Sequence, residues 1–257
     1  MTSQPSHNEE LLELLKGFEE APPELIARRK LLRRTDSKFL VKENALFEIL
    51  SRLHDHYQIL LANGEALACY ETLYFDTEDL RCFHDHRRGV RPRHKVRVRH
   101  YRDRNVTFLE IKTKRSEFIT NKQRKQQLDH SVELKAEDLE FIAASCGVPA
   151  DKLRAQLWTN FHRITLIGKN TNERITIDTG LNLVAGERAE NLLGVAIMEV
   201  KQSPFSMCTP AMVALRETGH RPASASKYCT ASMLLRDNLR CNRLLPGLRQ
   251  IEGMRNC

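Results

Sequence analysis

Alternation of polar and apolar residues is the main pattern along this chain. It is typical of β-strands, in which successive side chains point to opposite faces. The pattern predicts strands at residues 35–41, 69–76, 91–101, 106–114, 159–168, 174–183 and 195–202. A polar turn at 102–105 predicts that the third and fourth of these strands form a hairpin, and residues 186–191 are expected to form the loop between the last two.

Between the strands, apolar residues recur at helical spacing. They predict helices at residues 8–19, 42–54, 209–217 and 226–239. Residues 121–157 contain no proline before Pro149 and are expected to form two or three further helices, whereas the basic, weakly patterned residues 240–257 are expected to form a frayed tail. Antiparallel strands with helices inserted between the hairpins predict an α+β protein built around a meandering sheet or barrel.

One predicted strand carries a row of like charges. Lys or Arg stands at every second position from Arg93 to Arg99, so the cations share one face of that strand. Like charges in a row repel one another, and such a face therefore requires water or an anion opposite it. The same alternation continues in other predicted strands, at Asp36 and Lys38, Glu110, Lys112 and Lys114, Asp178, and Glu199 and Lys201.

Two interpretations of these charged faces remain open. For any single strand, the polar face of a half-buried sheet is simply solvated. The combination of strands favours instead a barrel with apolar outer positions and charges inside, filled by water, metal and a highly charged ligand, because unpaired buried charges are costly. A polyphosphate meets this need, since Arg binds phosphate bidentately, Lys supplies a point charge, and a few carboxylates hold Mg²⁺ or Mn²⁺.

Composition narrows the class of partner and the compartment. The chain has 257 residues and a formal charge of +8, which favours nucleic acid, an acidic membrane surface or a phosphorylated small molecule. Seven scattered cysteines without CxxC spacing argue for a reducing compartment and against a zinc site or disulfides. No apolar run approaches the roughly 18 residues of a membrane span, and no signal peptide is evident. A cytoplasmic location is expected.

Other motifs carry less weight. His-Asp-His occurs at residues 54–56 and 84–86, and we interpret both pairs as surface histidines rather than metal ligands. The chain has no GxxxxGK[ST], GxGxxG or GxSxG motif, so the sequence indicates neither a P-loop, nor a Rossmann phosphate site, nor a nucleophile elbow.

Seven short segments together resemble one known family, the polyphosphate polymerase domain of the vacuolar transporter chaperone (VTC). That family belongs to the triphosphate tunnel metalloenzymes, relatives of CYTH phosphatases. The resemblance covers about residues 30–237 and divides the chain into an N-terminal extension (1–29), a tunnel domain (30–237) and a basic C-terminal tail (238–257). The segments that carry it are 34–39 (RTDSKF), 74–77 (YFDT), 95–99 (KVRVR), 108–112 (FLEIK), 174–179 (RITIDT), 198–201 (MEVK) and 226–228 (SKY).

The resemblance implies an antiparallel β-barrel tunnel with helices packed outside. It also implies transfer of the γ-phosphoryl group of ATP to orthophosphate or a growing polyphosphate chain, with Mn²⁺ or Mg²⁺. Carried over by motif, the residues that bind phosphate are Lys38, Arg97, Arg99, Lys112, Arg163, Lys201, Ser226 and Lys227, among which Lys227, Arg163 and Lys201 are the expected catalytic residues. Glu199 matches the metal-binding residue, with Asp36, Glu110 and Asp178 as further candidates.

One residue departs from the family's pattern. Asp36 stands where the family usually carries Glu, which is one methylene longer. Arg93 and Lys95 are expected nearer the tunnel mouth, where they attract the anion. The chain is expected to hold the catalytic module alone, so that transfer of product across a membrane requires a separate membrane-protein partner at the inner face.

Rival functions remain open on the residues alone. The same tunnel could hydrolyse inorganic triphosphate or a nucleoside triphosphate, or bind polyphosphate without catalysis. A nucleic-acid-binding module fits the nine Lys and Arg against one Asp between Arg87 and Arg104. However, only 6% of residues are aromatic and the basic strands lack interleaved stacking residues, so we expect no specific nucleic-acid partner. The sequence leaves the oligomeric state open.

Overall fold

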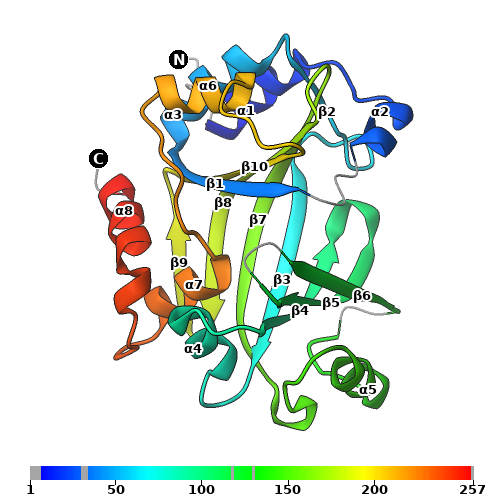
Figure 1. Ribbon diagram of the computed structural model, residues 1–257, viewed down its shortest axis with the longest axis vertical. Coiled ribbons are helices and arrows are strands. Elements are labelled where there is room, and N and C mark those ends of the chain that lie inside the picture. The colour runs from blue at the N-terminus through cyan, green and yellow to red at the C-terminus, as the bar shows by residue number, and fades with distance from the viewer. Residues whose placement is uncertain (1–6, 30–33, 117–118, 129–130, 256–257) are drawn as a thin grey trace, which may run out of the picture.

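A single antiparallel sheet of ten strands forms the body of the protein. In the computed structural model, which describes residues 7–29, 34–116, 119–128 and 131–255, the strand order is β1-β10-β8-β7-β3-β4-β5-β6, with β2 beside β7 and β9 beside β8 (Figure 1). The strands are β1 (Thr35–Lys42), β2 (Tyr57–Ile59), β3 (Ala68–Asp76), β4 (Arg93–Tyr101), β5 (Val106–Lys114), β6 (Thr120–Gln127), β7 (Arg154–Gly168), β8 (Glu173–Ala185), β9 (Arg188–Leu192) and β10 (Val195–Gln202).

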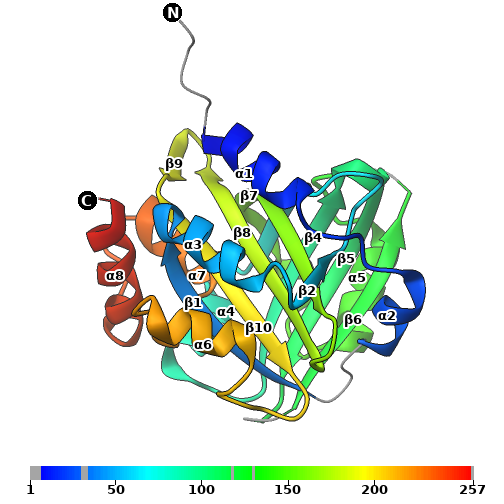
Figure 2. The same cartoon turned by 90° about the horizontal axis from the view of Figure 1, so that it is seen from above.

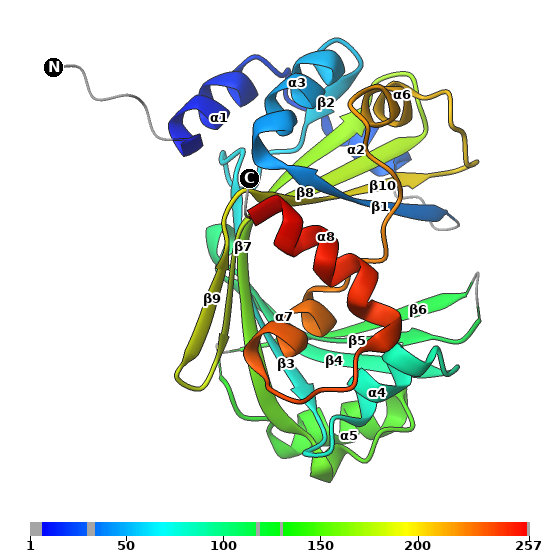
Figure 3. The same cartoon turned by 90° about the vertical axis from the view of Figure 1, so that its left-hand side faces the viewer.

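The sheet curls into two arms. Figure 3 shows β1, β10 and β8 above, and β3, β4 and β5 below. Among the described strands, β1 and β6 stand at the two ends of the order and do not pair with each other. The expected α+β fold with an antiparallel tunnel is therefore confirmed, but the tunnel is an open curl rather than a hydrogen-bonded closed barrel.

Several helices pack on the outer faces of the two arms. Helices α1, α3 and α6 lie over the upper arm and α5 lies beneath the lower arm, whereas α7 lies between the arms (Figures 2 and 3). The helices are α1 (His7–Lys16), α2 (Pro23–Arg28), α3 (Glu43–Leu53), α4 (Arg81–Arg88), α5 (Ala136–Ser145), α6 (Pro210–Glu217), α7 (Lys227–Leu235) and α8 (Leu245–Arg255). The short 3-10 turns are η1 (Arg102–Arg104), η2 (Ala150–Lys152) and η3 (Asn242–Leu244).

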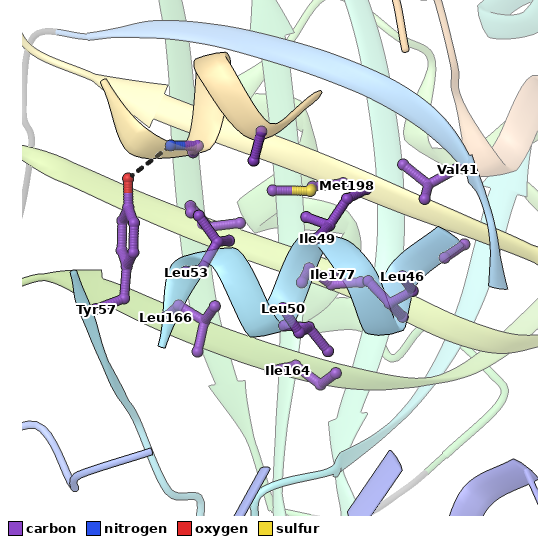
Figure 4. Packing of buried hydrophobic residues seen from close by; sticks show 14 of the residues in the cluster. Val41, Leu46, Ile49, Leu50, Leu53, Tyr57, Ile164, Leu166, Ile177 and Met198 are labelled. Carbon is purple, nitrogen blue, oxygen red and sulfur yellow. Dashed lines mark hydrogen bonds between the residues drawn. The ribbon is translucent and has the colours of Figure 1, made fainter. Parts of the chain in front are cut away.

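The two faces of the strands differ in polarity. The apolar face packs against the helices, and the polar face turns toward the interior. On β8, Ile175 and Ile177 are fully buried in the outer core, whereas Thr176 and Asp178 alternate with them and face the interior. Figure 4 shows α3 packed on this outer face, with Leu50 and Leu53 against residues of β7, β8 and β10. At the edge of the same cluster the Tyr57 hydroxyl accepts a hydrogen bond from the Ala211 backbone N–H (3.3 Å).

The prediction of helices throughout residues 121–157 is wrong at both ends. Residues 120–127 form β6, and residues from Arg154 onward already belong to β7, so that only α5 and the η2 turn are helical. Strand β6 has no apolar face because it is an exposed edge strand, held by its pairing with β5. Without apolar alternation, nothing in its sequence distinguishes a strand from a polar helix.

Two further predictions near the C-terminus are wrong. The expected loop at 186–191 is largely β9, which pairs with β8 in a hairpin. The expected frayed tail contains η3 and α8, and Ile251 of α8 is buried against the core that includes α7. Helix α7 itself ends at Leu235, four residues earlier than predicted. Helices α2 and α4 and strand β2 had no counterpart among the predicted elements.

The N-terminal extension packs into the main core. Leu11 and Leu15 of α1 are fully buried in the same hydrophobic cluster as α3, β7, β8 and β10. The predicted boundary between this extension and the tunnel domain, at residue 30, lies outside the described residues.

We therefore predict that α1 contributes to global stability. Leu15→Ala removes a buried side chain and should lower the free energy of unfolding by about 2–5 kcal/mol, measured by chemical denaturation. Leu14→Ala, at a half-buried position on the same helix, is the matched control and should cost clearly less. An unfolding midpoint unchanged by Leu15→Ala would show instead that α1 is a detachable extension.

Candidate functional site

The interior of the curl is lined by cations that outnumber its carboxylates. They come from β1, β10, β8, β7, β4, β5, β6 and from α7, so that residues far apart in sequence share the inner side of the curled sheet. The cations are Lys38, Lys95, Arg97, Arg99, Lys112, Lys122, Arg163, Arg174, Lys201 and Lys227, and the carboxylates are Asp36, Glu110, Asp178 and Glu199.

One carboxylate, Asp178, holds two of these cations. The Arg163 guanidinium binds it bidentately, with Nε 2.5 Å from Oδ1 and Nη2 2.8 Å from Oδ2, and Lys227 donates to the same Oδ2. Burial alone would raise the pKa of Asp178, but these two cations hold it well below its usual value. Burial lowers the pKa of Lys227 to about 8, with Asp178 opposing and Arg163 adding to the shift. Lys227 also lies over the Phe161 ring, 4.5 Å from its centroid.

A second carboxylate, Glu110, organises the lower arm. Its Oε2 accepts from Arg97 Nε (2.8 Å) and Nη2 (2.6 Å), and its Oε1 accepts from Lys122. The Glu110 side chain is only 1% exposed. Although burial opposes it, the charge of Arg97 keeps the pKa of Glu110 well below its usual value. The register of β4, β5 and β6 places these residues on adjacent strands of one face.

The third carboxylate, Glu199, forms an ion pair on β10 in the upper arm. Lys201 Nζ lies 2.6 Å from Glu199 Oε2 and donates to Thr176 Oγ1 at 3.0 Å. Glu199 is also opposite Lys38 in the strand register. Burial would raise its pKa, but Lys201 and Lys38 hold it below its usual value. Asp36, by contrast, is an exposed residue at the rim and pairs with Arg34 at 2.8 Å.

Five cations of the interior, Arg99 and Lys112 among them, have no such carboxylate within the described residues. Among the described residues, no carboxylate lies within ion-pair distance of Arg99 or Lys112. Arg99 is 4% exposed, its Nε donates to Thr72 Oγ1 (3.0 Å), and its guanidinium lies over the rings of Tyr70 and Phe161. Lys112 points into the open interior, where burial and the charges of Lys38 and Lys95 lower its pKa to about 8. An anion placed between the arms would stabilise both.

The start of α7 joins the two arms. Ser226 caps this helix by accepting from the Cys229 N–H (3.4 Å), and its hydroxyl also accepts from Lys95 Nζ of the lower arm (2.8 Å). Lys38 of the upper arm donates to the Ala225 carbonyl oxygen (2.9 Å). The helix N-terminus, with its positive dipole end, thus lies among cations in the interior, an arrangement that favours phosphate.

A buried carboxylate outside the interior fixes α7 in place. Asp76, fully buried at the end of β3, accepts from the Tyr228 hydroxyl at 2.5 Å. It also accepts from the backbone N–H groups of Cys82 (2.8 Å) and Phe83 (2.9 Å), which caps α4. The YFDT and SKY motifs are therefore in contact, because Asp76 belongs to one and Tyr228 to the other.

The structure brings nearly all of the predicted site residues together. Those that line one interior are Lys38, Arg97, Arg99, Lys112, Arg163, Lys201, Ser226, Lys227, Glu199, Glu110 and Asp178. Asp36 is at the rim. Lys95, which was expected near the mouth, reaches Ser226 within the site.

Sequence reasoning missed several residues of the interior. Lys122 was missed because its strand was predicted as helix, although Lys122 and Arg124 alternate in the way that Arg97 and Arg99 do. Tyr74 was noted only as part of the YFDT segment and not as a site residue, yet its hydroxyl accepts a hydrogen bond from Arg97 (3.2 Å). Burial raises the pKa of Tyr74, but the charges of Arg97, Arg99 and Lys95 prevail and lower it to about 8.

Only one of the two histidine pairs is exposed as predicted. His54 and His56 are exposed, as expected, but His84 and His86 are half-buried, so the second surface assignment is wrong. They lie on α4, which packs between β4 and α7. The cysteines from Cys69 to Cys241 are free within the described chain.

The carboxylates of the interior are the candidate ligands for a divalent metal. Within the described residues, no three His, Cys, Asp or Glu side chains gather as a complete metal cage. Mg²⁺ is commonly bound by one or two carboxylates together with substrate phosphates and water. Glu199 meets that requirement, because it is a carboxylate kept ionised in a cavity lined by phosphate-binding side chain types. The residues therefore fit a metal that is held jointly with the substrate.

Comparison with solved structures supports the fold. The chain is similar to a putative adenylate cyclase from Bacillus halodurans, with 11% identity, a TM-score of 0.50, and coverage of 76% of this chain and 94% of that chain. A putative adenylyl cyclase from Hippeastrum, described as having a dominant triphosphatase activity, is 13% identical with a TM-score of 0.46 and coverage of 81% and 99%. At these identities the likeness concerns the fold alone. No curated protein sequence matches this chain.

The curled antiparallel sheet is the fold that this chain shares with the putative adenylate cyclase from Bacillus halodurans. The family model of the VTC domain matches residues 33–236. The chain belongs to the VTC domain family, as the motifs indicated. Among the described residues, none of the helices has the length and apolar character needed to cross a membrane.

The lowered lysine pKa values predict how pH controls anion binding. A bound polyanion favours the charged form of Lys112, so affinity for inorganic triphosphate should fall as pH rises above about 8, where the free protein loses that proton. Lys112→Arg keeps its charge and should show a smaller fall between pH 7 and 9.5 by titration calorimetry.

Lys16→Arg, on the exposed surface of α1, is the control for this measurement. It experiences the same titration of the ligand itself and should follow the wild-type protein. Identical pH dependence in Lys112→Arg and wild type would contradict a binding role for the Lys112 charge.

Proposed function

We propose that this protein is an ATP-dependent polyphosphate polymerase. The supporting observation is an interior in which cations exceed carboxylates and into which α7 carries Lys227, in a chain of the VTC domain family. The excess positive charge of such an interior favours binding of a polyanion. Phosphoryl transfer requires mainly positioning and neutralisation of charge, which this arrangement supplies.

The nucleotide phosphates would be held by cations from both arms. Arg97 and Arg99 of the lower arm, with Lys112, meet Lys201 of the upper arm across the interior. In the absence of substrate, Glu110 holds Arg97 and Glu199 holds Lys201 in place. The phosphate oxygens would then share Arg and Lys donors that are already positioned, which lowers the entropic cost of binding.

Lys227 and Arg163 would act on the transferred group. Both converge on Asp178, so their donors lie within one hydrogen-bonded cluster. In this proposal they stabilise charge on the γ-phosphoryl group as it moves in line from ADP to the acceptor. A new P–O bond forms to the acceptor oxygen while the bond to the β,γ-bridging oxygen breaks, and ADP leaves.

The acceptor would be orthophosphate or the terminal phosphate of polyphosphate. Either is already an anion near neutral pH, so no strong general base is needed. Glu199 would hold Mn²⁺ or Mg²⁺, and a bound divalent ion would supply charge neutralisation between phosphate oxygens. The cytoplasmic location and a separate membrane-protein partner remain predictions from the sequence.

Incubation with ATP and Mn²⁺ or Mg²⁺, followed by a gel stained for polyphosphate, tests the proposed reaction. We expect long polymer and ADP. Release of orthophosphate without polymer would instead favour a triphosphatase of the same fold. Binding of polyphosphate without ATP turnover would favour a non-catalytic binding module.

Two substitutions test the proposed residues. Glu199→Gln keeps a hydrogen-bond acceptor for Lys201 but removes the charge, and Lys227→Ala leaves Asp178 paired with Arg163. Each should reduce polymer synthesis by at least about a hundredfold, a loss of roughly 3 kcal/mol of transition-state stabilisation, in a folded protein. Glu190→Gln, in a surface pair with Arg255, is the control and should retain activity. Near-wild-type synthesis by either site variant would refute its assigned role.

A further inference from the structure

Tyr70 belongs to an aromatic pair on the inner face of the sheet, and none of the sequence motifs includes it. It lies on β3, in register with Phe161 of the neighbouring strand β7. The two rings are stacked, with centroids 5.3 Å apart and planes inclined by only 9°. Thr72, the next residue on this face of β3, accepts a hydrogen bond from Arg99, so Tyr70 also faces the charged interior.

Two guanidinium groups lie over this pair of rings. The Cζ atom of Arg99 is 5.3 Å from the Tyr70 centroid and 5.6 Å from that of Phe161. The Cζ atom of Arg163 is 5.0 Å and 5.3 Å from the same two centroids. These distances are within about 6 Å, the range in which the negative face of an aromatic ring attracts a cation. The pair therefore brings together cations from β4 and β7, the strands on either side of β3.

The two arginines differ in what else holds them. Arg163 is bound bidentately by Asp178, which fixes its guanidinium independently of the rings. Arg99 has no carboxylate within the described residues, and in that part of the chain its side chain donates a hydrogen bond to Thr72 alone, through Nε. The aromatic pair is therefore the main remaining support for the orientation of the Arg99 guanidinium.

The kind of support matters at a site for anions. A carboxylate would fix Arg99, but it would also neutralise its charge and occupy the paired N–H donors that a phosphate group binds. An aromatic face orients a guanidinium without adding a negative charge, and it leaves the terminal N–H groups for the ligand. Arg99 can thus be held in a fixed orientation while it keeps its full attraction for a polyanion.

We propose that Tyr70 is a positioning residue for phosphate binding. Stacked on Phe161, its ring holds the guanidinium of Arg99 in place before the anion arrives, so that less conformational entropy is lost on binding. Tyr70 acts through Arg99 and does not itself bind the anion. The inference rests on the proposed function, because it concerns phosphate chains bound in the interior, but it requires no catalysis.

Titration calorimetry with inorganic triphosphate, at pH 6.5 and without metal, tests this role. At this pH the lysines with pKa values near 8 are charged. Tyr70→Phe keeps the ring and should bind like wild type. Tyr70→Leu keeps an apolar side chain but removes the ring, and it should bind about tenfold more weakly, equivalent to roughly 1.4 kcal/mol. Wild-type affinity in Tyr70→Leu, or an equal loss in Tyr70→Phe, would show that the ring does not position a cation.

Trp158→Leu is the matched control for lost packing. Trp158 is a half-buried aromatic residue of β7 that packs against the hydrophobic cluster containing Ile142 of α5, on the outer side of the lower arm. Its substitution should lower the free energy of unfolding, measured by chemical denaturation, but leave the affinity for triphosphate unchanged. If Trp158→Leu and Tyr70→Leu lose affinity equally, damage to packing explains both results and the proposal is overturned.

A double-mutant cycle decides whether Tyr70 acts through Arg99. In an Arg99→Gln background the guanidinium is absent, while Arg163 keeps its Asp178 partner. There, Tyr70→Leu should change the affinity by no more than about twofold. A tenfold loss in that background as well would refute the role of Tyr70. Because polymer synthesis is scored separately, that result leaves the proposed reaction standing, whereas a wild-type protein that binds no triphosphate overturns both.

Arginine side-chain NMR of the wild-type protein needs no substitution of Tyr70. The Nε–H signal of Arg99 can be identified by its loss in Arg99→Lys. Without ligand, its order parameter should be close to that of Arg163, which Asp178 fixes. A mobile Arg99 side chain in the ligand-free protein would mean that nothing orients it before the anion binds, and the proposal would be wrong.

Discussion

Repulsion among cations inside a curled sheet is the constraint on which this structure depends. Ten positive side chains face a shared interior, and three buried or half-buried carboxylates pair with five of them. Each carboxylate is kept ionised by its neighbours, and each reduces the cost of burying the cations around it. The carboxylates are nonetheless too few to neutralise the interior. The protein is therefore stable without ligand while retaining a strong preference for an anion.

The outer surface of the sheet makes this interior possible. Charges that face inward contribute little to folding, so the stabilising free energy must come from the opposite face of the same strands. On β8 and β10 that face carries Ile175, Ile177, Met198 and Val200, which α3 and α6 cover. The helices on the outside thus stabilise the sheet, while its inner face carries the charged residues. Residues of α1 complete the same core, so the N-terminal segment is structurally part of the body.

The sequence predicted those strands in which the two faces differ most. In β4, β5 and β10, charged and apolar residues alternate strictly, and both the elements and the inward face could be identified. Strand β6 could not, because both of its faces are polar and its pairing with β5 is not encoded in local periodicity. The contact of Lys95 with Ser226 and the burial of His86 could not be predicted either, because both depend on α7 and α4 lying at the end of β4. Family motifs located Lys227, which periodicity alone could not.

Asp76 has a consequence for the position of Lys227. One buried carboxylate caps α4 and holds Tyr228 of α7. The two helices are therefore tied to the same point at the end of β3. The position of Lys227 at the start of α7 thus depends on a carboxylate that does not contact it.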